Sequence, residues 1–92
     1  VIAVGNLRNT DSLENSSSRG PASDGRIKPD ISANGYNQMS TGPNNTYQVG
    51  GGTSAASPSV MGTLAQISHA YRSLNQIRPP AALLKAAIRN TL

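Results

Sequence analysis

The sequence lacks cysteine, phenylalanine and tryptophan, and three tyrosines are its only aromatic residues. Without cysteine the chain can form neither a disulfide nor a thiolate metal site. Large rings supply much of the apolar area that ordinary cores bury, so an aromatic content of 3% in 92 residues predicts a thin core. A chain of this length buries only about two-thirds of its unfolded surface. We therefore expect part of a larger domain rather than a small domain that folds alone.

Long apolar runs and clusters of basic residues are also missing. No run approaches the roughly 20 apolar residues of a membrane span, so we expect no membrane segment. The net charge is +4, but the basic residues are scattered, whereas nucleic-acid binding typically uses a basic face with stacking aromatics. We therefore expect no nucleic-acid partner. The acidic residues match no EF-hand spacing, and the sequence predicts no metal site and no cofactor.

Three stretches organise the chain. Residues 1–5 (Val-Ile-Ala-Val-Gly) are apolar and rich in β-branched side chains, which favours a strand buried on both faces. Residues 6–52 are dense in Ser, Asn, Gly, Asp and Pro, which is typical of loops. Within them we expect a short extended segment at 28–33 and a strand at 46–49 that leads to a glycine run.

The third stretch predicts two helices. Apolar residues recur at helical spacing from Thr53 to about Leu74, and Pro58 lies in the first turn or so, where a missing amide costs little. A second helix is expected from Ala81 to Asn90. The first helix is too apolar to be covered by one or two strands, so further elements must pack against it. The simplest source of these elements is the rest of a mainly parallel sheet, which indicates an α/β fold. The apolar stripe of the first helix consists of Ala56, Val60, Leu64, Ile67, Tyr71 and Leu74.

The densest chemical signal lies at residues 50–58, where three glycines lead into a helix that starts with Thr53 and Ser54. Glycine adopts backbone conformations closed to other residues, and the free amides of a helix start favour negative charge. Ser54 is therefore a candidate nucleophile with an oxyanion site at its own amide. The residue types support equally well that Thr53 or Ser54 is only a helix cap. An anion-binding module at this junction is a third, weaker alternative.

Other catalytic patterns do not fit. A Walker loop needs a lysine after its glycines, and the elbow of α/β-hydrolases needs glycine where Ala56 stands. His69, the only histidine, lies about 22 Å along the helix from Ser54 at 1.5 Å per residue, so we expect it on the helix surface and not as a base. We assign no triad role to the acidic residues Asp11, Glu14, Asp24 and Asp30.

Residues 52–58 (Gly-Thr-Ser-Ala-Ala-Ser-Pro) resemble the Gly-Thr-Ser-x-Ala-x-Pro signature around the nucleophile of subtilisin-like serine proteases, the subtilase family. Residues 1–5 resemble the strand of this family that follows the oxyanion-asparagine region. Residues 17–21 (Ser-Ser-Arg-Gly-Pro) resemble its Ser-Ser-x-Gly-Pro loop, and residues 24–31 resemble the Lys-Pro-Asp-Ile strand of its larger members. Four segments in the family's order are far more specific than one, and they cover nearly the whole chain.

The resemblance implies that residues 1–92 are the carboxyl-terminal part of a single subtilase catalytic domain. That domain is a three-layer α/β fold with a mainly parallel sheet, of which two or three strands and two helices would be present. The implied activity is that of a serine endopeptidase in which Ser54 attacks a peptide carbonyl and its amide binds the oxyanion. Thr53 would assist with its hydroxyl, while Gly52 and Pro58 would shape the turn. The implied partners are a polypeptide substrate and the missing amino-terminal part of the domain, and the implied location is secreted or the cell envelope.

The chain also departs from the family pattern. Ala55 stands where well-known members have Met, Ser59 where a His often follows the Pro, and Asn34 where a Pro is usual; none of these changes removes a catalytic group. The Asp, His and oxyanion Asn of the family precede this region, and their motifs are absent from the 92 residues, so we expect these residues alone to be inactive. Subtilases often bind calcium, for which this chain gives no support. The alternative is a non-catalytic binding domain of the same fold.

Overall fold

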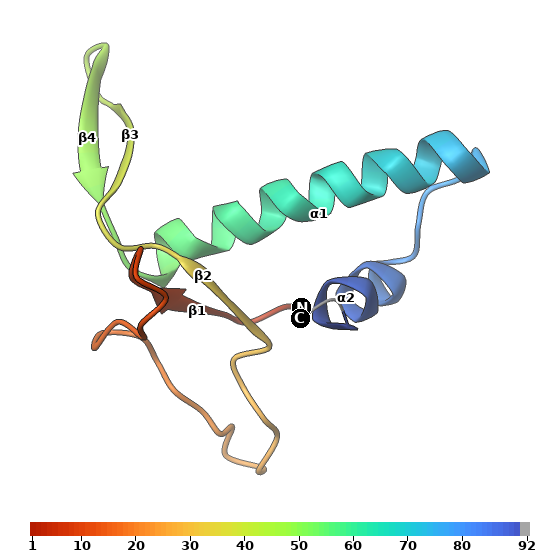
Figure 1. Cartoon of the computed structure of the whole chain (residues 1–92), viewed down its shortest axis with the longest axis horizontal. Coiled ribbons are helices and arrows are strands. Elements are labelled where there is room, and N and C mark those ends of the chain that lie inside the picture. The colour runs from red at the N-terminus through yellow and green to blue at the C-terminus, as the bar shows by residue number, and fades with distance from the viewer. Residues whose placement is uncertain (91–92) are drawn as a thin grey trace. The chain divides into compact units, whose positions relative to one another are not determined.

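The computed structural model describes residues 1–90, which form four short strands followed by two helices (Figure 1). They divide into two compact parts, Val1–Ser59 and the part that begins at Val60, and each is described by itself. The elements are β1 (Val4–Leu7), β2 (Ile31–Asn34), β3 (Gln38–Gly42), β4 (Thr46–Gly50), α1 (Thr53–Asn75) and α2 (Ala81–Asn90). The class is therefore mixed α/β, as predicted.

The strands β1 and β2 pair in parallel, with Val4 opposite Ile31 and Leu7 opposite Asn34. The first strand therefore begins later and extends further than the expected residues 1–5, because pairing with β2 rather than apolar character sets its bounds. Val1 is fully exposed. The second strand covers only the latter part of the segment expected at 28–33 together with one further residue.

A buried carboxylate holds the start of the two paired strands together. One oxygen of Asp30, Oδ2, accepts hydrogen bonds from the Ala3 amide at 2.9 Å and from the Lys28 ammonium at 2.8 Å. The Asp30 side chain is 3% exposed and that of Lys28 is 27% exposed. Because a carboxylate removed from water needs such partners, this cluster fixes the segment that enters β2.

Replacing Asp30 by alanine is expected to lower the free energy of unfolding of the whole protein by about 2–3 kcal/mol, because the Lys28 ammonium and the Ala3 amide lose their acceptor. Urea denaturation measures the change. Asp24→Ala is the matched control, since Asp24 pairs with Arg26 at side-chain exposures of 57% and 69%, and such surface pairs contribute little. Equal losses in the two variants would contradict the assigned role of Asp30.

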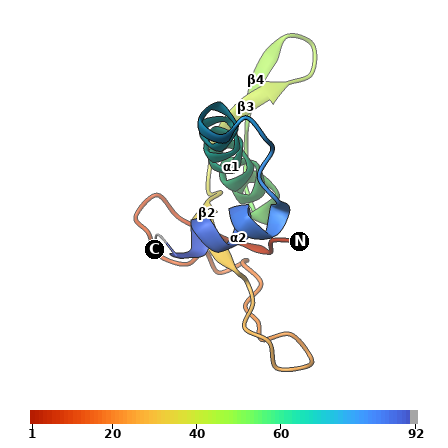
Figure 2. The same cartoon turned by 90° about the vertical axis from the view of Figure 1, so that its right-hand side faces the viewer.

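The strands β3 and β4 form an antiparallel hairpin in which Met39 faces Val49 and Gly42 faces Thr46. Asn44 and Asn45 in the connecting turn have positive φ angles of 57° and 60°, a conformation that asparagine tolerates well. The hairpin extends to one side of the β1–β2 pair, and the loop between β1 and β2 extends to the other (Figures 1 and 2).

The hairpin corrects the expectation of two or three strands. Residues 46–49 were expected as a strand and lie in β4, but β3 falls in the stretch expected to be loop. The sequence of β3, Gln-Met-Ser-Thr-Gly, has no apolar alternation, and its strand conformation depends on pairing with β4. Exposed apolar side chains on the hairpin are Met39, Tyr47 and Val49.

Both helices lie where their apolar spacing predicts. The first ends at Asn75, one residue beyond the expected end, and the second has the expected bounds. Fewer residues of the apolar stripe of α1 are buried than its spacing predicts. Ala56 and Val60 are buried, whereas Leu74 is 84% exposed. Within residues 1–90, no helix combines the length and apolar character that crossing a membrane requires.

Candidate active site

Backbone hydrogen bonds connect the end of β1 to the start of α1. The Gly35 amide donates to the Leu7 carbonyl at 3.2 Å, and the Gly52 amide donates to the Gly35 carbonyl at 3.0 Å. The Gly52 carbonyl in turn accepts from the amides of Ala55 and Ala56 at 3.0 and 3.2 Å. The glycine run is therefore not a free linker, because the sheet fixes the position at which the helix begins.

Gly52 occupies the cap position of α1. Its φ angle is +97°, in the left-handed region that favours glycine, and its carbonyl accepts the first helical hydrogen bonds, as a residue at the amino-terminal cap does. Thr53 and Ser54 lie inside the helix. The cap residue is therefore Gly52 and neither Thr53 nor Ser54, while the role of Gly52 in shaping a nucleophile turn stays a prediction.

Ser54 is exposed in the first turn of α1, beside a cavity of about 420 Å³. An α-helix leaves its first amides without partners in the helix, so the Ser54 amide is among those that can bind an oxyanion. The other residues that line the cavity come from α1, from β3 and from the glycine run: Ala55, Pro58, Gln38, Met39, Ser40, Gly50 and Gly51. The arrangement places an accessible hydroxyl and helix-start amides against a concave surface.

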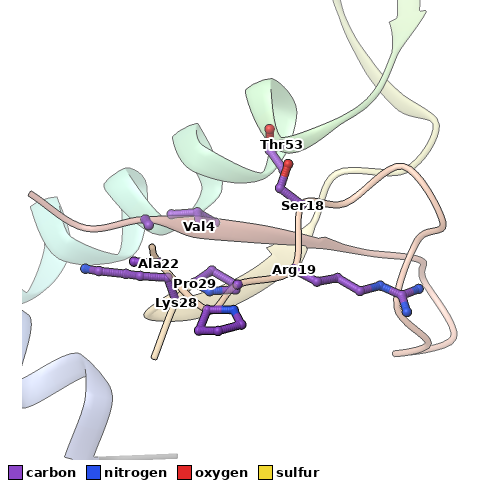
Figure 3. Close-up of a pocket in the computed structure, with 10 residues that line it drawn as sticks. Val4, Ser18, Arg19, Ala22, Lys28, Pro29 and Thr53 are labelled. Atoms are coloured by element: carbon purple, nitrogen blue, oxygen red, sulfur yellow. The ribbon is translucent and has the colours of Figure 1, made fainter. Parts of the chain in front are cut away.

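Thr53 lines a different cavity, of about 390 Å³. Figure 3 shows Thr53 of α1 and Ser18 of the β1–β2 loop at one end of this cavity. The segments 17–21 and 24–31, two of the motifs found in the sequence, contribute most of its other walls, together with Ala3 and Val4. Thr53 and Ser54 thus line separate cavities, and assistance of Ser54 by the Thr53 hydroxyl stays a prediction.

The structure brings no base to Ser54 within residues 1–90. The only histidine, His69, is exposed on the later turns of α1, as expected. The carboxylates of Asp24, Asp30 and Glu14 are each bonded to a neighbouring basic side chain. Among the described residues no three His, Cys, Asp or Glu side chains gather in a way that could hold a metal ion.

Two ion pairs outside the site change the pKa of one of their members. The hydrogen bond from the Arg26 guanidinium lowers the pKa of Asp24 from its ordinary value. The hydrogen bond to Glu14 raises the pKa of Arg8, whose guanidinium also lies 5.0 Å from the centre of the Tyr36 ring. Both pairs lie on loops that flank the strands, and neither contributes a proton acceptor to Ser54.

Asn6 lies near the start of α1 and was not among the residues that the sequence predicted for the site. It is 1% exposed, and in the described chain neither polar atom of its side chain has a hydrogen-bond partner. Its Oδ1 lies 2.6 Å from the point where a Cβ on Gly35 would stand, and the Gly52 carbonyl and the Ala56 amide lie 2.3 and 2.9 Å from that point. The one sequence feature that could have drawn attention to Asn6 is its carboxamide, which directly follows the apolar residues 1–5.

Comparisons with known proteins show what this chain is similar to. The sequence profile of the subtilase family (Peptidase_S8) matches residues 1–92. The chain is 46% identical over 84 residues to the minor extracellular protease Vpr of Bacillus subtilis, covering 82% of this chain and 10% of that protein. It is 42% identical over 65 residues to the PII-type proteinase of Lactococcus lactis subsp. cremoris, covering 71% of this chain and 3% of that protein.

Because the family profile covers the entire chain, this chain belongs to the subtilase family. The PII-type proteinase of Lacticaseibacillus paracasei is similar to the same extent, at 42% identity over 65 residues. The chain spans no more than 10% of the length of these relatives.

Proposed function

We propose that this chain carries the nucleophile of a serine endopeptidase and is the carboxyl-terminal part of its catalytic domain, a three-layer α/β fold with a mainly parallel sheet. The observation that carries the proposal is Ser54, which is exposed at a glycine-capped helix start beside a cavity of about 420 Å³. Family membership supports the assignment, since the relatives named above are proteinases. The substrate would be a polypeptide, and the site of action outside the cell or at its envelope.

The chemistry begins with Ser54 Oγ, which bonds to the carbonyl carbon of the scissile peptide while its proton passes to a base. The negative charge moves to the carbonyl oxygen, to which the Ser54 amide at the start of α1 donates. The carbon–nitrogen bond then breaks, and the base returns the proton to the departing amine. An ester on Ser54 remains. Water then gives one proton to the base, and its oxygen bonds to the acyl carbon. The bond between this carbon and Ser54 Oγ breaks, the base returns the proton to Oγ, and the carboxylic acid leaves.

The base and its carboxylate partner must come from outside these residues. His69 is exposed on the later turns of α1, and the carboxylates of Glu14 and Asp30 are bonded to basic neighbours. A serine hydroxyl without a positioned base is a weak nucleophile at neutral pH. The 92 residues alone would therefore hydrolyse no peptide, and the activity belongs to the whole protein.

A fluorophosphonate probe tests the proposal on the whole protein, because it forms a bond only with an activated serine. We expect one labelled peptide, the one that contains Ser54, as identified by mass spectrometry. The 92-residue chain on its own is the control and should stay unlabelled. A whole protein that is folded by circular dichroism and yet unlabelled would instead be a non-catalytic binding domain of the same fold.

A further inference from the structure

The side chain of Asn6 is an unexplained buried polar group. A carboxamide carries two donor hydrogens and an acceptor oxygen, and buried groups of this kind are nearly always hydrogen-bonded. Asn6 is 1% exposed, and in the described chain both Oδ1 and Nδ2 lack a partner. Because an apolar side chain would avoid this cost, the residue calls for a reason other than stability of the strand.

The backbone of Asn6 does not need this side chain. Its amide donates to the Ser17 hydroxyl at 3.0 Å, and its carbonyl accepts from the Glu14 amide at 3.0 Å. In the parallel pair it stands opposite Ala33. These bonds fix the position of Asn6 at the end of β1 whatever its side chain, so the carboxamide is held in place but is not used by the strand.

The carboxamide lies beneath the nucleophile turn. Its Oδ1, the Gly52 carbonyl oxygen and the Ala56 amide nitrogen all lie within 3 Å of the point that a Cβ on Gly35 would occupy. The Ala56 amide already donates to the Gly52 carbonyl at 3.2 Å. The carboxamide, which has a donor side and an acceptor side, can therefore join this bond as a third partner, in the three-centre arrangement that is common at helix ends. Rotation about the last side-chain bond exchanges Oδ1 and Nδ2, so either end can face either group.

We propose that Asn6 is a positioning residue for Ser54, whose carboxamide engages the Gly52 carbonyl and the Ala56 amide as substrate loads the turn. This contact fixes the cap of α1 and, through it, the hydroxyl and amide of Ser54. Hydrogen bonds of this kind are often incomplete before substrate binds and tighten in the reacting complex. The inference rests on the proposed serine-protease function and adds a residue to it.

The test is the Asn6→Leu variant of the whole protein, since leucine keeps the branched shape and removes both polar atoms. We expect the rate of fluorophosphonate labelling at Ser54 and kcat to fall by about ten- to a hundredfold. KM should stay within about twofold. The thermal midpoint should not fall, because apolar atoms replace unpartnered polar ones. A side chain with a purely structural role would show the reverse, a lower midpoint with an unchanged labelling rate.

Ser17→Ala is the matched control, because Ser17 is 5% exposed and holds Asn6 through its backbone amide. It should lower the thermal midpoint more than Asn6→Leu does and lower kcat less, because the carboxamide itself is still present. In Asn6→Asp, the protonated carboxyl restores a donor and an acceptor whereas the ionised form lacks the donor. The ratio of its kcat to that of the wild type should therefore rise as pH falls.

The outcomes separate the two proposals. A labelled wild-type protein with the same labelling rate in Asn6→Leu would overturn the positioning role and leave the proposed function intact. An unlabelled, folded wild-type protein would overturn the proposed function and this inference with it. A flat pH ratio for Asn6→Asp would also count against the positioning role.

Discussion

If Ser54 has the proposed role, its substitution by alanine is expected to lower kcat for peptide hydrolysis by about three to six orders of magnitude, the loss that removal of a serine-protease nucleophile causes. The side chain is exposed at the start of α1, so its removal leaves no cavity and should leave the thermal midpoint unchanged. Substrate should still bind, because the other residues that line the neighbouring cavity are unchanged.

The matched control is Ser57→Ala, which removes an exposed hydroxyl from the same end of the helix. It should keep kcat within about threefold of the wild type, since surface substitutions away from a site have small effects. Initial rates on a protein substrate, normalised to the concentration of folded enzyme, measure both variants. Activity that survives in Ser54→Ala would show that another residue is the nucleophile.

Replacing Gly35 by alanine is expected to displace the nucleophile turn. The added Cβ would stand 2.3 Å from the Gly52 carbonyl oxygen, 2.6 Å from Asn6 Oδ1 and 2.9 Å from the Ala56 amide nitrogen. Two of these three atoms are backbone, so the turn itself must move. A shift of this kind costs about 1–3 kcal/mol of stability, and misplacement of a nucleophile by about 1 Å costs about a hundredfold in rate.

Gly62→Ala is the control for the Gly35 substitution. Its added Cβ meets no atom within 4 Å, and alanine in the middle of a helix is more stable than glycine by about 0.5–1 kcal/mol. The thermal midpoint of Gly62→Ala should therefore rise or stay the same, and its labelling rate should stay the same. Similar losses in both variants would show that the close contacts of Gly35 do not hold the turn.

The sequence located the parts of the molecule that are specified locally. The helical spacing of residues 53–74 and the prolines before residue 81 predicted both helices, because each turn of a helix bonds to the next turn of the same segment. Ser54 became the candidate nucleophile for a similar reason, since Gly52, Thr53 and Pro58 lie close to it in the chain. The same reasoning placed β4 but not β3, whose polar residues become a strand only through their partner.

The tertiary structure decided what depends on residues far apart in sequence. It set β1 at residues 4–7 through pairing with β2, and it brought Asn6, Gly35, Gly52 and Ala56 together beneath one turn. It also separated the adjacent Thr53 and Ser54 into two cavities. No local pattern contains these relations, because they arise from hydrogen bonds and packing between segments. The sequence by itself therefore determined the family and the candidate nucleophile, and only the folded chain showed what holds that nucleophile in position.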